Sequence, residues 1–213
     1  MKEFRDGEGR AVDWRLVRAA IFDMDGTLYR QRPVRIRMAF RLGKHYLLHP
    51  GSARELAGIW YFRKIREQAA FRTQSMAEQI RAAAQKAGLA ETEGLEKAIR
   101  KWMFQEPLAL IPDHGNEPVL ALIRTMREEG KTVIIYSDYP PEEKLKTLGV
   151  VPDAVYYPGF GGITEMKPSG ENVRKILKDL KLKAEETVYL GDRDEKDGKS
   201  ARDAGVRFLP VKP

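Results

Sequence analysis

Short apolar runs alternate with amphipathic segments over much of the chain. Runs rich in Val, Ile, Leu and aromatic residues predict strands at residues 19–23, 132–137, 154–157, 187–190 and 207–211. Between these runs, the pattern predicts helices at residues 114–129, 141–148 and 170–180. Strands that alternate with helices are typical of a parallel sheet covered by helices on both faces. We therefore expect an α/β fold, with its functional residues at the carboxyl ends of the strands.

The segment between the first two predicted strands has a different pattern. Residues 52–87 are rich in Ala, Arg, Glu and Gln, and residues 93–103 carry apolar residues at helical spacing. Residues 34–42 alternate apolar residues with arginines, which fits a strand, but Pro33 suits the first turn of a helix. We favour a helix there and expect the whole segment to be helical.

The charge distribution separates the same segment from the rest of the chain. The 213 residues carry a net charge of +7. Residues 29–106 hold 16 Lys/Arg and 7 Asp/Glu, whereas the remaining residues carry a net charge of −2. This distribution suggests two units with different surfaces, of which the basic one favours an anionic partner.

Several features bear on the location of the protein. The chain contains no cysteine, which excludes disulfides and thiolate metal sites and favours a reducing, intracellular location. Residues 1–6 mix charges and lack the apolar stretch of a signal peptide. No apolar run approaches the length of a membrane span. We expect a cytoplasmic protein without a membrane partner.

Acidic and other polar residues follow the predicted strands. In chain order these residues are Asp23, Asp25, Ser137, Asp138, Lys167, Asp192, Asp194, Glu195 and Asp197. Because the strand ends of a parallel sheet share one edge, the carboxylates would repel one another unless they bound protons or a cation. An all-oxygen donor set without His or Cys favours Mg²⁺. Such a site suits phosphoryl transfer, in which one Asp can be the nucleophile and a second carboxylate the acid and base.

Four short motifs within this set resemble a known family. Residues 23–28 (DMDGTL) resemble the first motif, DxDGT, of the haloacid dehalogenase (HAD) superfamily. Ser137 matches the second motif, Lys167-Pro168 the third, and Gly191-Asp192 with Asp197 the GDxxxxD form of the fourth. All four occur in order and each has the expected strand or loop context. The chain is therefore similar to HAD hydrolases, and most of all to the capped phosphatases that resemble phosphoglycolate phosphatase.

The resemblance implies a domain organisation. It implies a Rossmann-like α/β core at residues 1–30 and 107–213. An all-helical cap domain of the C1 type is expected to be inserted at residues 31–106. Asp25 distinguishes the chain from the dehalogenase branch of the superfamily, which lacks an acid at this position, so a phosphatase or a phosphomutase is expected.

The resemblance also implies roles for four motif residues. Asp23 is expected to be the nucleophile that becomes phosphorylated. Asp25 is expected to protonate the leaving group and then to activate water. Ser137 and Lys167 are expected to hold the phosphoryl oxygens, and Lys167 also to steady Asp23.

A magnesium site is implied beside these residues. Mg²⁺ is expected to bind Asp23, the backbone carbonyl of Asp25, and Asp192. Asp197 is expected to help as a second acidic contributor. For that last role the alternatives are two neighbouring residues, Asp194 and Glu195.

The predicted function is Mg²⁺-dependent hydrolysis of a small phosphomonoester metabolite through an aspartyl-phosphate. The basic segment favours a substrate with a second negative group, which phosphoglycolate-like or nucleotide substrates would provide. Arg30 and Arg32 lie within nine residues of Asp23 and are candidates to contact that group. A phosphomutase on the same core is one alternative, and a nucleic-acid-binding protein without turnover is another. The sequence leaves the oligomeric state open.

Overall fold

The chain forms two compact units in a computed structural model that describes residues 4–212. The core unit comprises the residues up to Arg32 and from Pro112 onward, and the helical unit comprises Pro33–Ile111. Each unit has a hydrophobic core of its own. Each can therefore be described by itself.

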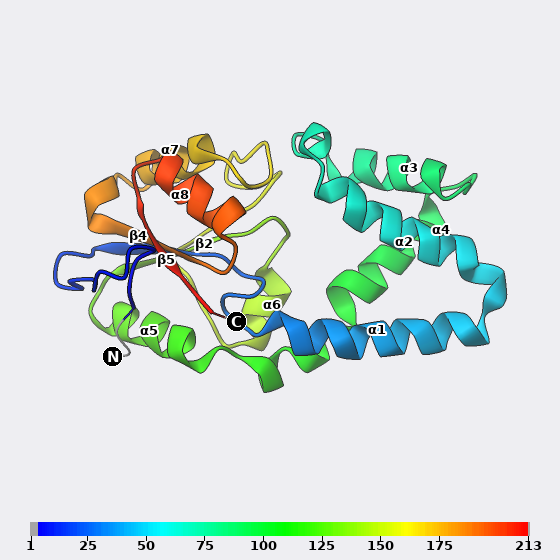
Figure 1. Ribbon diagram of the computed structural model, residues 1–213, viewed down its shortest axis with the longest axis horizontal. Helices are drawn as coiled ribbons and strands as arrows, with labels where there is room; N and C mark the ends of the chain where they lie inside the picture. Colours follow the sequence, from blue (N-terminus) through cyan, green and yellow to red (C-terminus); the bar gives the residue numbers. More distant parts are fainter. Residues whose placement is uncertain (1–3, 213) are drawn as a thin grey trace. The chain divides into compact units, whose positions relative to one another are not determined.

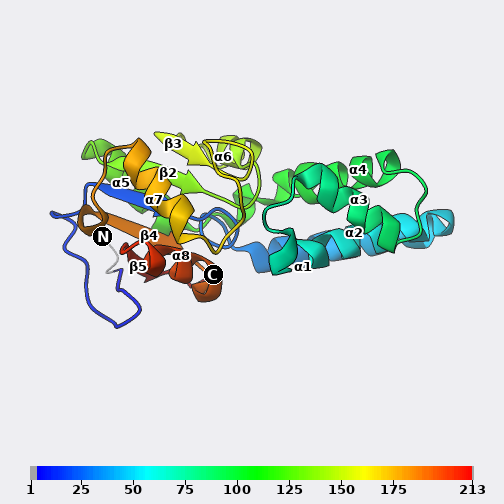
Figure 2. The ribbon, with the colours of Figure 1, turned by 90° about the horizontal axis from the view of Figure 1, so that it is seen from above.

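The core unit is built on a five-stranded parallel sheet (Figures 1 and 2). Its strands are β1 (Ala19–Phe22), β2 (Thr132–Tyr136), β3 (Ala154–Tyr156), β4 (Thr187–Gly191) and β5 (Arg207–Pro210). They lie in the order β3-β2-β1-β4-β5, and all neighbours are parallel. All four residues of β1 are fully buried, which explains why this central strand is apolar throughout. The α/β fold with a Rossmann-like parallel sheet that the sequence predicts is confirmed.

Helices cover both faces of this sheet. Figure 1 shows α7 (Gly170–Asp179) and α8 (Lys199–Asp203) on one side and α5 (Glu117–Glu128) on the other. Val173 and Ile176 of α7 pack with Tyr136 and Tyr189 of the sheet in one buried cluster. The helix α6 (Glu142–Thr147) follows β2 after a short loop.

The helical unit contains the basic segment. Its helices are α1 (Gln31–Leu48, which begins in the core unit), α2 (Ala53–Arg66), α3 (Met76–Lys86), α4 (Glu93–Ile99) and a π-helical turn at Arg100–Gln105. Residues 34–42 therefore lie in a helix, and their arginine alternation does not mark a strand. The core of this unit includes the fully buried Phe62 and Ile65. No helix among residues 4–212 is both long and apolar enough to cross a membrane.

The helical segment at residues 52–87 is interrupted between α2 and α3. Ser75 starts α3 with a capping box, in which the Glu78 N–H donates to Ser75 Oγ (3.3 Å) and the Ser75 N–H to Glu78 Oε2 (2.7 Å). These bonds satisfy backbone groups that a new helix leaves unpaired, so the Ser-x-x-Glu sequence marks a helix start. Further short 3₁₀-helices and one π-helical turn occur at Pro50–Ser52, Ala69–Phe71, Leu108–Leu110, Pro112–His114, Ala184–Glu186 and Asp194–Gly198.

Candidate active site

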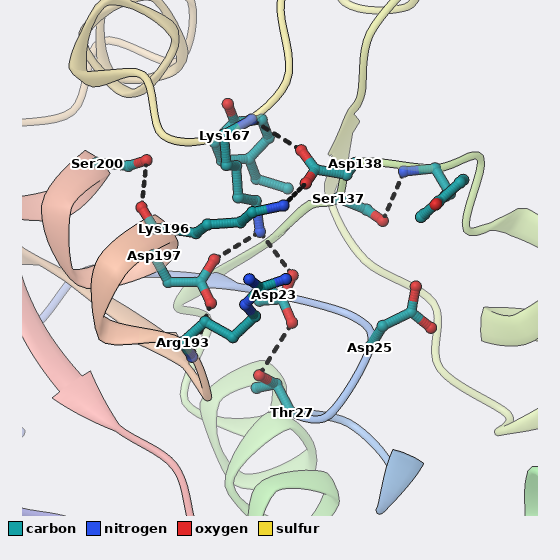
Figure 3. A network of polar contacts seen from close by, with 12 residues as sticks. Asp23, Asp25, Thr27, Ser137, Asp138, Lys167, Arg193, Lys196, Asp197 and Ser200 are labelled. Atoms are coloured by element: carbon teal, nitrogen blue, oxygen red, sulfur yellow. Dashed lines mark hydrogen bonds and ion pairs between the residues drawn. The ribbon is translucent and has the colours of Figure 1, made fainter. Parts of the chain in front are cut away.

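The carboxyl ends of the central strands bring the motif residues to one edge of the sheet (Figure 3). Asp23 directly follows β1, and its N–H donates to Leu190 O of β4 (2.9 Å). Ser137 directly follows β2, and its N–H donates to Tyr156 O of β3 (3.0 Å). These bonds continue the sheet pattern beyond the strands, so the side chains of both residues are held on rigid backbone.

Asp23 is buried and both of its carboxylate oxygens are engaged. Lys167 Nζ lies 2.6 Å from Asp23 Oδ1, and Thr27 Oγ1 donates to Asp23 Oδ2 at 3.1 Å. Thr27 is fully buried. Its part in orienting Asp23 is not predicted from the sequence, although Thr27 belongs to the DxDGT motif. The contacts fix the orientation of the carboxylate before any substrate binds.

Lys167 is the centre of the polar network. Its Nζ also lies 2.8 Å from Asp197 Oδ1, and its backbone N–H donates to Asp138 Oδ1 at 2.8 Å. Burial by itself lowers the pKa of Lys167, but the Asp197 and Asp23 carboxylates together hold this pKa well above its ordinary value. The lysine therefore stays an ammonium and neutralises part of the acidic charge around it.

Three carboxylates lie close enough to share one cation. Asp23, Asp192 and Asp197 each place one oxygen within 4.8 Å of the oxygens of the other two. Asp192 Oδ1 is buried and has no hydrogen-bond partner within residues 4–212. A buried carboxylate oxygen that lacks a donor is costly unless a cation binds it. The all-oxygen donor set and this orphaned oxygen fit a hard divalent cation.

The pKa values of two of these carboxylates, Asp23 and Asp192, are also consistent with a bound cation. Burial raises the pKa of Asp23 well above its ordinary value, and the Asp197 and Asp192 carboxylates raise it further, whereas Lys167 opposes them. Burial and the Asp197 charge raise the pKa of Asp192 to about 6. One lysine therefore does not offset the burial of Asp23 and Asp192, and a bound cation would favour the ionised form of both carboxylates.

Asp25 lies apart from this group. Figure 3 shows Asp197 and Asp25 on opposite sides of Asp23. Asp25 Oδ1 accepts a hydrogen bond from the Tyr29 hydroxyl and lies 2.5 Å from Lys144 Nζ, which comes from α6. Burial and the Asp25 carboxylate raise the pKa of Tyr29 well above its ordinary value, so Tyr29 keeps its proton and remains a donor.

Lys144 is not predicted as a site residue from the sequence. It lies in the middle of α6 and is only 7 % exposed, whereas Lys146 on the same helix is exposed. The sequence of α6, EEKLKT, contains no signal that separates the two lysines. Burial of Lys144 and its contact with Asp25 distinguish the two lysines.

The three acidic residues left open for the second acidic position have different surroundings. Asp197 is 2 % exposed. Its carboxylate accepts hydrogen bonds from Lys167 Nζ, the Tyr189 hydroxyl and the Arg193 N–H. Asp194 is exposed and pairs with Arg202, and Glu195 is exposed and pairs with Arg193. Asp197 alone among these three lies in the group of three carboxylates.

The remaining predicted residues lie at the borders of the network. Ser137 is 2 % exposed, and its Oγ accepts a hydrogen bond from the Tyr139 N–H at 3.1 Å. Arg30 and Arg32 are exposed around the start of α1, and the Arg30 N–H donates to His114 O at 2.8 Å. Contacts from these residues to a substrate remain predictions.

The structure shows an α/β fold in which carboxylates gather at the ends of parallel strands. The chain matches a family model described as haloacid dehalogenase-like hydrolase over residues 17–205. It therefore belongs to the haloacid dehalogenase-like hydrolase family.

Part of the chain is similar in sequence to a curated protein that is named as a phosphatase. A glyceraldehyde 3-phosphate phosphatase from Methanocaldococcus jannaschii is 45 % identical over 76 residues. That alignment covers 33 % of this chain and 32 % of the relative, so the chain spans about a third of that curated protein.

Solved structures are similar over a greater length at lower identity. A 2-haloacid dehalogenase from Pseudomonas syringae has a TM-score of 0.61 at 18 % identity, covering 90 % of this chain and 85 % of its own. A predicted phosphoglycolate phosphatase from Haemophilus somnus has a TM-score of 0.58 at 16 % identity, covering 91 % and 84 %. At these identities the similarity establishes the fold, and the reaction has to be argued from the site.

Proposed function

We propose that this protein is a Mg²⁺-dependent phosphatase that hydrolyses a small phosphomonoester through a phosphorylated Asp23. The observation that carries the proposal is the pair formed by Asp23 and Lys167, 2.6 Å apart, beside the buried Asp197 and the partly buried Asp192. This arrangement provides a fixed carboxylate nucleophile and positive charge for the phosphoryl oxygens. Phosphoryl transfer depends mainly on positioning and on neutralisation of charge, both of which this site supplies.

In the first step, a carboxylate oxygen of Asp23 forms a bond to phosphorus while the bond from phosphorus to the leaving alcohol breaks. Asp25 donates a proton to the leaving oxygen. In the second step, Asp25 accepts a proton from a water molecule that attacks the phosphoaspartate. Inorganic phosphate leaves, and Asp23 returns to its starting state. Lys167 and Ser137 bind the phosphoryl oxygens throughout.

We assign the cation site to Asp23, Asp192 and the backbone carbonyl of Asp25, with Asp197 beside them. When bound, Mg²⁺ supplies positive charge that lets the nucleophile approach an anionic phosphoryl group. Lys167 and Thr27 hold Asp23 in one orientation, and Gly26 leaves room for the Asp192 carboxylate.

We propose that the helical unit, residues 31–106 in the sequence-based division, is a cap domain that sets substrate specificity. Its basic excess favours a substrate with a second negative group, and Arg30 and Arg32 are candidates to contact that group. The name of the M. jannaschii relative puts triose phosphates on the test panel beside phosphoglycolate and nucleotides. Asp25 favours phosphate esters over haloacids, since a dehalogenase does not need to protonate a leaving oxygen.

A panel of phosphomonoesters tests the proposal. The purified protein is incubated with each ester, with Mg²⁺ or with EDTA, and released phosphate is measured. We expect release that depends on Mg²⁺ and that disappears in Asp23→Asn, which folds because Asn fills the same space. The matched control is Asp13→Asn, which removes an acidic residue whose contacts to Arg15 are exposed.

Unchanged turnover in Asp23→Asn would remove the nucleophile assignment. Isomerised product without free phosphate would identify a phosphomutase instead. Halide release from a 2-haloacid, without phosphate release from any ester, would place the protein with the dehalogenases.

A further inference from the structure

Asp25 is held by two donors that converge on the same oxygen. Lys144 Nζ lies 2.5 Å from Asp25 Oδ1, and the Tyr29 hydroxyl donates to this oxygen as well. Two contacts to one oxygen fix the rotation of the carboxylate about its bond to Cβ. They thereby also fix the direction of the second oxygen, Oδ2.

The position of Lys144 is itself well defined. Its Nζ lies 5.9 Å from the ring centre of Tyr29 and 5.9 Å from that of Tyr139, and the residue is 7 % exposed. The end of this flexible side chain is therefore buried near two aromatic rings. Helix α6 is anchored next to it by Leu145, which is 4 % exposed.

A purely structural role is the simpler interpretation of such a pair. A buried ion pair, however, contributes little net stability, because removing two charges from water offsets most of their attraction. The pair also joins two elements that the reaction uses, since α6 follows the loop that contains Ser137, and Asp25 follows β1. A lysine at this place aligns the acid with the phosphoryl-binding loop.

We propose that Lys144, together with Tyr29, is a positioning residue that presents one oxygen of Asp25 to the leaving group and to water. This inference rests on the proposed function, in which Asp25 is the acid and base. Lys144 acts only through Asp25, and it adds nothing when Asp25 is absent. The four sequence motifs do not include it.

Esters with different leaving groups test this role. A nitrophenolate leaves without protonation, whereas an alkoxide needs the proton that Asp25 donates. We therefore compare kcat/KM for 4-nitrophenyl phosphate with that for the best alkyl phosphate of the panel. In Lys144→Met we expect a loss of about tenfold to a hundredfold with the alkyl ester, a fraction of what general acid catalysis contributes. With the aryl ester we expect a loss of less than about threefold, because that step needs little acid catalysis.

A double-mutant cycle separates positioning from other effects. Asp25→Asn should show the same preference for the aryl ester, and adding Lys144→Met to Asp25→Asn should cause no further loss. Lys146→Met is the matched control, since this exposed lysine lies on the same helix, and it should keep the wild-type values. Thermal melts followed by circular dichroism establish that each variant is folded.

If Lys144→Met does not fold, the same comparison of the two esters can be made with Tyr29→Phe and Lys144→Arg. Tyr29→Phe removes the other donor and should shift selectivity in the same direction, while Lys144→Arg should retain more alkyl activity than Tyr29→Phe retains. Equal losses with both esters, or a full additional loss in the double variant, would overturn the positioning role while the phosphatase proposal stands. A wild-type protein that releases no phosphate with Mg²⁺ would overturn the proposed function, and the positioning role with it.

Discussion

Gly26 and Asp192 are in close contact although they lie 166 residues apart in the chain. A Cβ atom at Gly26 would lie 2.2 Å from Asp192 Oδ2 and 2.5 Å from its Cγ. Gly26 also has a φ of +103°, which side chains other than hydrogen disfavour. The glycine of the first motif therefore makes the space that the aspartate of the fourth motif occupies.

We predict that Gly26→Ala displaces Asp192 and lowers phosphatase turnover by about a hundredfold, as misplacement of a site group by an ångström can do. The affinity for Mg²⁺, measured by calorimetry, should fall as well. Gly130→Ala is the control, because Gly130 also has a positive φ of +68° but has no atom within 4 Å of the added Cβ. Equal activity losses in both variants would indicate backbone strain rather than displacement of Asp192.

Asp197 and Asp194 provide a matched pair within one short turn, Asp194–Gly198. Asp197→Asn removes a charge that holds Lys167, and we expect activity to fall about 10- to 100-fold, as is usual when a group supporting metal ligands is lost. Asp194→Asn breaks an exposed pair with Arg202 and should leave kcat/KM near the wild-type value. The steady-state rates of both variants at saturating Mg²⁺ decide the matter, and a greater loss in Asp194→Asn would contradict the assignment.

The raised pKa of Asp192 predicts a pH dependence of stability for the metal-free protein. Its folded-state pKa of about 6 exceeds the ordinary value of 3.8, so the folded state binds more protons between these two values. Asp192 therefore contributes stability below pH 3.8 that is lost as the pH rises through about 6. Wild type in EDTA should lose melting temperature over this range relative to Asp192→Asn.

Addition of Mg²⁺ should reverse this trend, because the cation binds the ionised carboxylates and stabilises the folded state more as the pH rises. Melting curves at several pH values, with EDTA or with Mg²⁺, test both halves of the prediction. A wild-type melting temperature that rises relative to Asp192→Asn between pH 3.8 and about 6 in EDTA would show that the pKa of Asp192 is not raised.

Two phenylalanines of the helical unit differ in burial, so we expect their replacement by alanine to change the free energy of unfolding by different amounts. Phe62 is fully buried in the core of this unit, whereas Phe40 on α1 is 77 % exposed. Phe62→Ala should lower the free energy of unfolding by about 3–5 kcal/mol, because it leaves a cavity. Phe40→Ala should change it by no more than about 0.5 kcal/mol. Urea unfolding of the full chain, followed by far-UV circular dichroism, measures both, and equal effects would contradict the core packing.

The strands and the acidic edge could be predicted because both depend on local sequence. A strand buried on both faces has to be apolar, so β1 and β2 are visible as short runs of Ile, Val and Phe. Once the sheet is parallel, its carboxyl ends meet, and residues such as Asp23 and Asp192 come together without further information. The break between α2 and α3 was not predicted, because residues 52–87 were expected to form one helical segment, although the capping box of Ser75 and Glu78 is a local signal for a helix start.

The surroundings of Asp25 could not be predicted in this way. Lys144 and Lys146 are the same type of residue on the same helix. Which of the two is buried against Asp25, and which is exposed, depends on the rotation of α6 about its axis. The motif favours Asp197, but Asp194 and Glu195 remained alternatives because all three residues carry a carboxylate within one short turn. The π-helical turn at Asp194–Gly198 directs Asp197 inward and the other two outward.

The local order of apolar residues was sufficient to predict which segments form the sheet, and it placed Asp23 and Asp192 at the ends of two of its strands. The pairing of Lys144 with Asp25 became known only from the folded structure, whereas the pairing of Lys167 with Asp23 was already expected from the motifs. The reason is physical. Pairing of a buried charge depends on distances of a few ångströms between elements distant in the chain, and packing alone sets those distances.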